Sequence, residues 1–383
     1  MAGFRIPYFR PSIDDNDIRA VTDVLRSGWL TTGPNARALE EELAAYSGAK
    51  YVNAVNSATA ALHLALAAWD LGPGDEVITT PYTFTATANV IVHTGASPVF
   101  VDVRDGDANI DAGLIERALT PATKAIIPVH FAGEPCDMDA IMAIARPRGI
   151  KVLEDAAHAI GTFYRGRPVG TLSDAAAFSF YANKTITTGE GGALATDDEE
   201  LSERVRVLTL HGLSRDAWKR YDVGGAWRYD VVEFGFKDNL TDIAASLGRT
   251  QLARIEDFIE QRTRIAQRYI ANLRDEEHII LPQFAEENRH AWHLFVIRIG
   301  ESAPVGRDDV IRKLAEDGIQ TSVHFIPLHY FTAYRNLGHW KEGDFPVAER
   351  IFSGAISLPL FPDMTDNEVD EVSSSLRQIV RAK

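Results

Sequence analysis

Short apolar runs alternate with helical stretches from residue 51 onward, and this alternation constrains the fold more than any other feature. The predicted strands cover residues 51–55, 76–79, 98–101, 125–129, 151–153, 175–180 and 192–195. Strands that alternate with helices indicate a mainly parallel sheet with helices on both faces. Because such sheets bind ligands beyond the carboxyl ends of their strands, polar residues at those ends are candidate site residues.

The chain length predicts two domains, since 383 residues exceed what one hydrophobic core usually supports. An apolar stripe across residues 241–273 predicts one long or kinked helix, and we place the domain change within it. The expected organisation is a large α/β domain over residues 1–250 and a smaller α+β domain over 251–383. In the second domain we expect strands at 292–299 and 320–325 and helices at 307–316 and 366–380.

Composition excludes several function classes. A net charge of -15, from 39 Lys and Arg against 54 Asp and Glu, argues against a nucleic-acid partner. Cys136 is the only cysteine, so an intrachain disulfide or a cysteine-rich metal site is impossible. His290 and His293 stand three residues apart without further ligands at metal-binding spacing, so we expect no metal. Without a basic, apolar leader or an apolar run of about 18 residues, we expect a cytoplasmic protein with no membrane contact.

The segment 178–192 sets one lysine, Lys184, between an apolar run and a glycine-rich turn. A lone lysine is ordinarily a surface residue, but here strand-end acids and hydroxyl groups accompany it in the same predicted domain. A lysine amine condenses with an aldehyde, and the ring of pyridoxal phosphate carries an aldehyde and accepts electrons from a broken bond. We therefore predict that Lys184 carries pyridoxal phosphate as an imine and, once freed, moves a proton between two carbons.

The other requirements of that cofactor have candidates, each with a structural alternative. Asp155 could keep the ring nitrogen protonated, or it could cap a helix beginning at Ala156. The hydroxyls of Ser57 and Thr59, with the free amides of the following helix, could bind the phosphate or simply cap that helix. Ser179 could add a further hydroxyl to the phosphate site.

Two ring-bearing residues complete the set. Phe84 lies in an aromatic loop after a predicted strand and could cover the face of the cofactor ring, although buried core is its alternative. His158 follows Asp155 by three residues, which places both on one side of the predicted helix. It could face the phenolic oxygen of the ring, or it could be a satisfied structural histidine.

Five segments in consistent order, 56–61, 81–88, 154–158, 179–184 and 188–192, resemble the DegT-type sugar aminotransferases. The resemblance spans about Pro7 to Met364. It implies fold type I of the pyridoxal-phosphate enzymes, as in aspartate aminotransferase, and a homodimer with sites at the subunit interface. By this resemblance, Lys184 is the Schiff-base lysine and Asp155 the partner of the pyridinium nitrogen. Ala58, Thr59 and Ser179 contact the phosphate, and Phe84 stacks on the ring. His158 stands where the family has Gln or His, and Asn239 corresponds to the asparagine that reaches the cofactor phosphate of the neighbouring subunit.

Further segments, 27–34, 211–218, 291–295 and 357–364, resemble the branch that makes UDP-4-amino-4-deoxy-L-arabinose and related 4-amino sugars. This likeness implies glutamate as amino donor and a 4-keto nucleotide sugar as acceptor, with a product used in cell-surface polysaccharide or lipid modification. Segments 219–233 and 323–329 depart from the branch and could shape the sugar pocket. Candidates for holding the sugar nucleotide, each with an ordinary loop or structural role as its alternative, are Thr32, Gly33, Arg215, His324 and His329.

Other functions stay open at this point. A 3-keto nucleotide sugar or a cyclitol ketone would need the same cofactor set and a different pocket. A related sugar dehydratase replaces the lysine, so Lys184 argues against that reaction. From another class, the chain could be a non-catalytic regulatory or binding protein on this fold.

Overall fold

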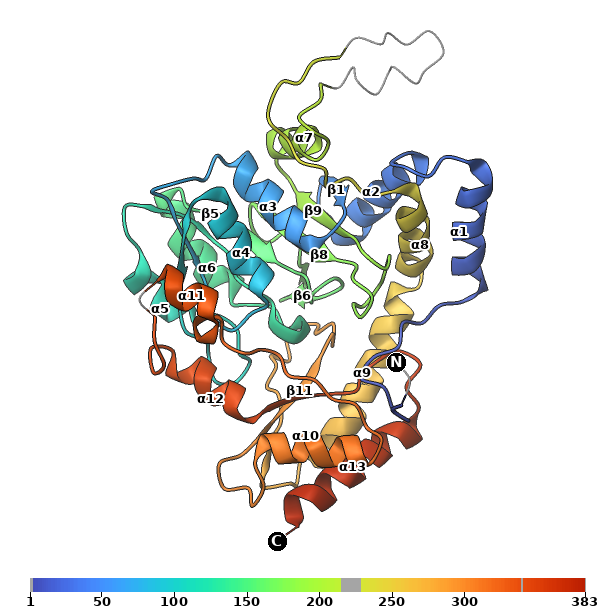
Figure 1. The fold of residues 1–383 in the computed structure, drawn as a ribbon, viewed down its shortest axis with the longest axis vertical. Coiled ribbons are helices and arrows are strands. Elements are labelled where there is room, and N and C mark those ends of the chain that lie inside the picture. The colour runs from blue at the N-terminus through green and yellow to red at the C-terminus, as the bar shows by residue number, and fades with distance from the viewer. Residues whose placement is uncertain (1–2, 215–228, 339, 383) are drawn as a thin grey trace.

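A seven-stranded sheet forms the centre of the computed structural model, which describes residues 3–214, 229–338 and 340–382 (Figure 1). The strand order is β1-β9-β8-β5-β4-β2-β3. Strand β9 runs antiparallel to both neighbours and every other adjacent pair is parallel, which confirms the mainly parallel sheet. The bounds are β1 Tyr51–Val55, β2 Glu76–Thr79, β3 Ser97–Phe100, β4 Thr123–Ile126, β5 Lys151–Asp155, β8 Ala175–Ser179 and β9 Gly192–Thr196.

Helices bury both faces of this sheet. Successive strand residues point to opposite faces, so in β5 Val152 packs into one core and Leu153 into the other. The core of Leu153 includes helices α3 (Ala58–Ala68), α4 (Thr85–Thr94) and α7 (Glu199–Leu208). The core of Val152 includes α2 (Pro34–Ser47), α5 (Ala112–Ala118), α6 (Met138–Ala145) and α8 (Asp242–Leu252). A short antiparallel pair, β6 (Phe163–Tyr164) and β7 (Arg167–Pro168), lies apart from the main sheet.

The C-terminal residues build a second core on a three-stranded antiparallel sheet, β10 (Ile279–Ile280), β11 (Phe295–Ile299) and β12 (Ala355–Leu358). Helices α10 (Arg307–Glu316) and α13 (Asp366–Arg381) contribute to this core and lie at the end of the molecule away from α7 (Figure 1). Helices α11 (Thr332–Leu337) and α12 (Pro346–Gly354) precede β12. The predicted α/β fold with a smaller C-terminal sheet is therefore confirmed.

The predicted long or kinked helix is two helices, α8 and α9 (Ile255–Leu273), separated by Ala253 and Arg254. Helix α9 places Ile259 in the core of the large sheet and Tyr269 in the C-terminal core. Because one helix serves both cores, the domain boundary between residues 250 and 251 stays a prediction.

Two local predictions were wrong. Residues 320–325 form no strand, because their only sheet pairing is a single bridge between Ser322 and Ser357, and β12 takes the place beside β11. No helix begins at Ala156. Its amide donates to the carbonyl of Ala177 in β8, and turns follow as far as Gly161 with its φ of +81°. The helix-cap alternative for Asp155 is therefore excluded.

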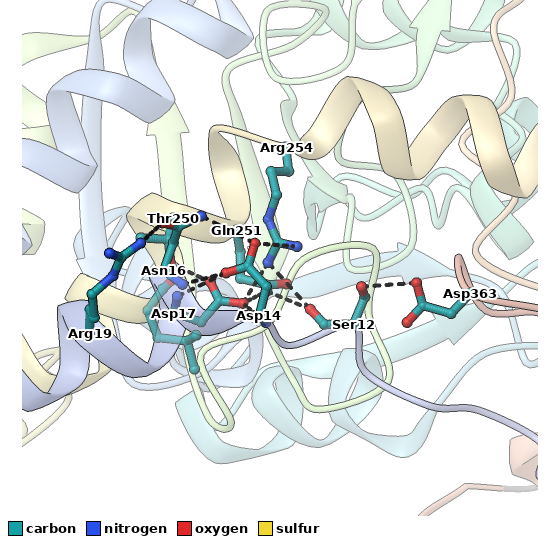
Figure 2. Close-up of polar contacts among 10 residues, drawn as sticks. Ser12, Asp14, Asn16, Asp17, Arg19, Thr250, Gln251, Arg254 and Asp363 are labelled. Atoms are coloured by element: carbon teal, nitrogen blue, oxygen red, sulfur yellow. Dashed lines mark hydrogen bonds and ion pairs between the residues drawn. The ribbon is translucent and has the colours of Figure 1, made fainter.

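Helix α1 (Asp15–Ser27) docks on the α8–α9 junction through a buried carboxylate, as Figure 2 shows. Asp17 Oδ2 accepts hydrogen bonds from Arg254 Nη2 at 2.5 Å, Gln251 Nε2 at 2.9 Å and the amide of Asp14 at 3.0 Å. Asp17 Oδ1 accepts from Thr250 Oγ1 at 2.5 Å. Both carboxylate oxygens are thus paired, and this cluster fixes the N-terminal helix where α8 meets α9.

Among the described residues, none of the helices has the length and apolar character needed to cross a membrane.

Candidate functional site

A cavity of about 520 Å³ opens where the loops after β1, β2, β5 and β8 meet, together with residues from the C-terminal part of the chain. It lies where the ligand of a parallel α/β sheet is expected. Nine predicted site residues line it, namely Ser57, Ala58, Thr59, Phe84, Asp155, His158, Ser179, Lys184 and His324.

Asp155, the last residue of β5, is only 5 % exposed. Its Oδ2 accepts a hydrogen bond from Thr87 Oγ1 at 2.7 Å, and its Oδ1 accepts from the amide of Ala157 at 3.2 Å. Burial raises the pKa of Asp155, and these two neutral donors oppose the rise only in part. No Lys or Arg of the described chain forms an ion pair with it, so a cationic ligand group would remove a real electrostatic cost.

Lys184 sits in a turn closed by the hydrogen bond from its own amide to the carbonyl of Tyr181 at 2.9 Å. Enclosure by the cavity walls lowers the pKa of Lys184 to about 8, and the negative charge of Asp155 opposes this change. Roughly one Lys184 side chain in ten is therefore a neutral amine at pH 7, far more than for an ordinary lysine. That is the state in which an amine attacks an aldehyde.

The start of helix α3 lines the same cavity through Ser57, Ala58 and Thr59. Ser57 caps the helix, with its Oγ accepting from the amide of Ala60 at 3.0 Å, which confirms the capping alternative. The first amides of a helix have no partner within the helix, so a helix start that borders a cavity is suited to an anion. A Cβ on Gly192 would lie 2.5 Å from the nitrogen of Ala58, so only glycine lets β9 pass this close to the helix start.

His158 is a neutral donor on the cavity wall. Its Nδ1 accepts a hydrogen bond from the amide of Ala132 at 3.3 Å, which assigns the ring proton to Nε2. Burial, with the positive charge of Lys184, holds its pKa well below the usual value. Its ring stacks near Phe325, with centroids 5.9 Å apart, and so keeps a fixed orientation.

Phe84 is 62 % exposed and lines the cavity, so the buried-core alternative is wrong for it. Its ring centroid lies 6.3 Å from that of Phe325. An exposed aromatic face beside a buried carboxylate and an anion-binding helix start can cover a flat, charged, phosphate-bearing ring.

The sequence profile of the DegT/DnrJ/EryC1/StrS aminotransferase family matches residues 11–377 of this chain. The chain belongs to this family. The predicted class, a pyridoxal-phosphate-dependent sugar aminotransferase, is thereby confirmed, and the non-catalytic alternative is dropped.

Several relatives cover almost the whole chain. It is 50% identical over 378 residues to the spore coat polysaccharide biosynthesis protein SpsC of Bacillus subtilis strain 168, with 98% of this chain and 97% of SpsC covered. Among solved structures, the PMP form of Spr1654 of Streptococcus pneumoniae, assigned as a sugar aminotransferase, has a TM-score of 0.93 and 37% identity, covering 98% of this chain and 99% of that one. PseC of Helicobacter pylori, an aminotransferase involved in pseudoaminic acid biosynthesis, has a TM-score of 0.91 and 29% identity, covering 98% and 99%.

The site of this DegT-family chain fits pyridoxal phosphate. Asp155 is a buried carboxylate without a directly paired cation, the start of α3 offers amides and hydroxyls to a phosphate, and Lys184 offers a partly neutral amine. These three groups line one cavity. In the part of the chain that the structure describes, no group of three or more His, Cys, Asp or Glu side chains could hold a metal ion.

Thr32 and Asn239 do not reach this cavity. They line a separate cavity of about 550 Å³ beside α2, β1 and α7. Asn239 Nδ2 donates to Thr32 Oγ1 at 2.7 Å, and Thr32 Oγ1 donates to the carbonyl of Leu240 at 2.5 Å. The two residues are therefore linked to each other and lie outside the cavity that holds Lys184 of the same chain.

The remaining substrate candidates have other surroundings. Gly33 caps α2, and a Cβ there would lie 2.1 Å from Trp29 Nε1, so close packing explains the glycine. His329 is 1 % exposed and does not line the cavity, and its Nε2 shares a hydrogen bond with Glu349 Oε1 at 2.9 Å while its Nδ1 has no partner among the described residues. Arg215 lies outside the described residues.

Sequence reasoning missed other residues that line the cavity, namely Thr87, Asn183, Glu190, His293 and Phe325. His293 entered the sequence analysis only as half of a histidine pair tested for metal spacing. Its Nε2 lies 3.5 Å from Lys184 Nζ, although 109 residues separate the two. No local pattern marks such a contact, since the fold alone brings these segments together.

Proposed function

We propose that this enzyme moves an amino group from glutamate to the C4 keto group of a nucleotide sugar, and that the resulting 4-amino sugar serves cell-surface polysaccharide or lipid modification. Support comes from the likeness of segments 27–34, 211–218, 291–295 and 357–364 to the 4-amino-sugar branch. The name of the relative SpsC refers to spore coat polysaccharide, and PseC is described as an aminotransferase of pseudoaminic acid biosynthesis. The first of these names supports a product that enters a surface polysaccharide.

The observation that carries the amino transfer is that Lys184 and Asp155 open into one cavity. Pyridoxal phosphate, when bound there, supplies an aldehyde that takes up the amino group and a pyridinium ring that draws electrons from the carbon being deprotonated. The carboxylate of Asp155 would hold the proton on the ring nitrogen, and Thr87 would hold that carboxylate in place. Because burial raises the pKa of Asp155, a nearby cation such as the pyridinium would favour its ionised form.

The other cavity residues bind and orient. In this proposal the amides of Ala58 and Thr59, with the hydroxyls of Ser57 and Ser179, hold the phosphate at the start of α3. Phe84 would cover one face of the ring and exclude water from it. His158, whose Nδ1 is already an acceptor, would donate a hydrogen bond from Nε2 to the phenolic oxygen.

Lys184 moves the proton. Its Nζ would take a proton from the α-carbon of glutamate and deliver it to the carbon on the other side of the transferred nitrogen, which is the aldehyde carbon of the cofactor. In the second half the same amine would work in the opposite sense and leave the proton on C4 of the sugar. A pKa of about 8 suits this task, because the amine changes its charge close to the operating pH.

For the sugar nucleotide we keep His324, which lines the Lys184 cavity with its Nδ1 held by Ser357 Oγ at 2.8 Å. Thr32 and Asn239 are proposed to act on the site of a partner subunit, as the resemblance implies for Asn239. Gly33 and His329 are no longer proposed, and Arg215 stays a prediction.

A homodimer with shared sites is part of the proposal. Residues 229–234 expose several large apolar side chains, of which Phe234 is 96 % exposed. Side chains of this kind on one segment are typical of a surface that a partner covers. Cytoplasmic location also stays a prediction.

Assays with glutamate and a panel of 4-keto and 3-keto nucleotide sugars, monitored by the appearance of 2-oxoglutarate, test the substrate. Turnover of a 4-keto sugar is expected. Turnover of 3-keto sugars or cyclitol ketones alone would move the assignment to the alternative. If the enzyme used only ordinary amino acid and keto acid pairs, the sugar proposal would fail.

Co-expression of Lys184→Ala with Asn239→Ala chains tests the shared site. If Asn239 acts across the interface, each mixed dimer contains one intact site and activity returns. If Asn239 acts within its own chain, every site carries a defect and the mixture stays inactive.

A further inference from the structure

One of the described side chains forms a hydrogen bond with Lys184 and has no role in the proposed function. The titratable groups that line its cavity, besides Lys184 itself, are Asp155, His158, Tyr181, Glu190, His293 and His324. Of these, His293 makes a polar contact with the amine, from Nε2 to Nζ at 3.5 Å. This is a long hydrogen bond, as contacts around a reacting group often are before substrate binds.

The backbone beside His293 is held with unusual firmness. Trp292 adopts a φ of 49°, which is an outlier for a bulky residue, and its ring stacks on His290 with centroids 3.9 Å apart. Arg262 is 3 % exposed, and its Nη1 donates to the carbonyls of Trp292 at 3.2 Å and His293 at 3.3 Å. A buried guanidinium is thus used to fix the position of one histidine.

The polar groups of His293 itself do not serve local stability. It is 4 % exposed, and in the described structure its Nδ1 is a buried atom without a hydrogen-bond partner. Buried polar atoms usually have a hydrogen-bond partner, and both ring nitrogens of His130 do, through the amide of Cys136 at 3.0 Å and Glu154 at 2.9 Å. Among the described residues, the contact with Lys184 is the hydrogen bond that the side chain of His293 makes.

We infer that His293 is a positioning residue whose Nε2 accepts a hydrogen bond from Lys184 Nζ and keeps the amine aimed into the cavity in both of its protonation states. An amine carries N–H groups whether it is neutral or charged, so an acceptor holds it in either state, whereas a donor could hold only the neutral form. The ring proton then lies on Nδ1. Burial and the charges of Lys184 and Arg262 keep the pKa of His293 well below its usual value, so the acceptor nitrogen stays free.

The assignment rests on the aminotransferase activity and not on the identity of the sugar. A hydrogen bond to an ammonium is stronger than one to a neutral amine, so His293 favours the charged form of Lys184. Removing the acceptor should lower the pKa of Lys184 below its value of about 8 and leave the amine less well oriented.

The test titrates Lys184 directly in full-length protein loaded with pyridoxamine phosphate, a form in which this amine is free. Competitive acetylation across a pH range, read by peptide mass spectrometry, gives the pKa of Lys184 in wild type, His293→Leu and His293→Gln. The glutamine side chain places an acceptor near the position of Nε2, while leucine keeps only the volume. His63→Leu is the matched control, since His63 on α3 contacts His93 and Phe236 outside the cavity.

His293→Leu should lower the Lys184 pKa and reduce kcat by about 10²-fold with little change in the KM for glutamate. His293→Gln should restore both values towards wild type, and His63→Leu should change neither. A Lys184 titration unaffected by leucine, or glutamine no better than leucine, would overturn the inference. The labelling experiment uses no sugar. The predicted change in the Lys184 pKa would therefore stand even if the 4-keto sugar proposal failed.

Thermal unfolding separates misfolding from the predicted effect. Leucine removes an unpartnered buried nitrogen, so the variant should melt at or above the wild-type temperature. Should it not fold, His293→Asn takes its place, because the asparagine amide ends short of the Nε2 position. The inference is supported if the Lys184 pKa is lowered in the Asn variant and stays at the wild-type value in the Gln variant. Equal Lys184 pKa values in the two variants contradict it.

Discussion

Asp17 and Asp155 are both buried aspartates, yet their surroundings differ. Asp17 accepts four hydrogen bonds, one of them from the guanidinium of Arg254 (Figure 2). Asp155 accepts two, from the neutral donors Thr87 and Ala157, and burial raises its pKa. All partners of Asp17 come from the chain, one of them a paired cation, whereas Asp155 feels the charge of Lys184 but forms no ion pair.

The comparison teaches how to separate a structural charge from a functional one. A buried carboxylate whose partners come from the protein stabilises a junction between elements, as Asp17 does for α1 and α8. A buried carboxylate without a paired cation, in a cavity that also holds a lysine of lowered pKa, is matched to a bound group. Substitutions around Asp155 should therefore lower activity, and substitutions around Asp17 should lower stability.

Lys184→Ala should give the largest effect. With no amine to bind the cofactor or move the proton, kcat should fall by at least about 10³-fold. The melting temperature of the cofactor-free protein should hold or rise, because a charge buried in the cavity is removed. Steady-state kinetics and thermal unfolding check this pair of outcomes, and an active alanine variant would break the comparison.

Asp155→Asn should come next, with kcat lower by about 10²- to 10³-fold because an amide cannot hold the proton on the ring nitrogen. Cofactor should still bind, as seen by its absorbance after gel filtration, since the phosphate site is untouched. Unfolding in urea should show stability equal to or above wild type. Near-normal turnover would remove the role given to this carboxylate.

Asp17→Asn should reverse the pattern. Loss of the charge opposite Arg254 is expected to cost about 3 kcal/mol of unfolding free energy, while kcat per folded molecule stays at the wild-type value. Urea denaturation and kinetics on the same samples test the split. A variant of unchanged stability but low kcat would mean that the junction acts on the site.

The pH dependence of stability should show the smallest effect. In the cofactor-free protein the folded-state pKa of Lys184, about 8, lies below the ordinary lysine value of 10.5, so the unfolded chain binds more protons between these values. Stability should therefore gain from Lys184 as pH rises from about 8 to 10.5, and this gain should be absent in Lys184→Met. Equal pH slopes for the two proteins would show that Lys184 is not enclosed as described.

The sequence predicted the strands of the large sheet well, because each is a short apolar run whose burial on two faces leaves a clear pattern. It failed at Ala156, where an alanine-rich stretch looks helical but its first amide pairs with β8. It also predicted a strand at 320–325 and not at β12, since both are short and only the pairing with β11 decides between them.

The site followed the same division. Residues in local motifs, such as Ser57, Asp155 and Lys184, were found because strand ends and glycine-rich turns mark them in the chain. His293 was not found as a site residue, because its contact with Lys184 depends on the packing of β11 and α9 against the cavity. Sequence patterns thus reveal what one segment supplies, and the fold reveals what distant segments add.

Borohydride reduction of the protein loaded with pyridoxal phosphate, followed by peptide mass spectrometry, tests the central claim most directly, because reduction makes the bond between lysine and cofactor permanent. The account predicts a single pyridoxyl group on the peptide that carries Lys184, and none in Lys184→Ala. Attachment at another lysine, or no attachment in a protein that binds the cofactor, would contradict it.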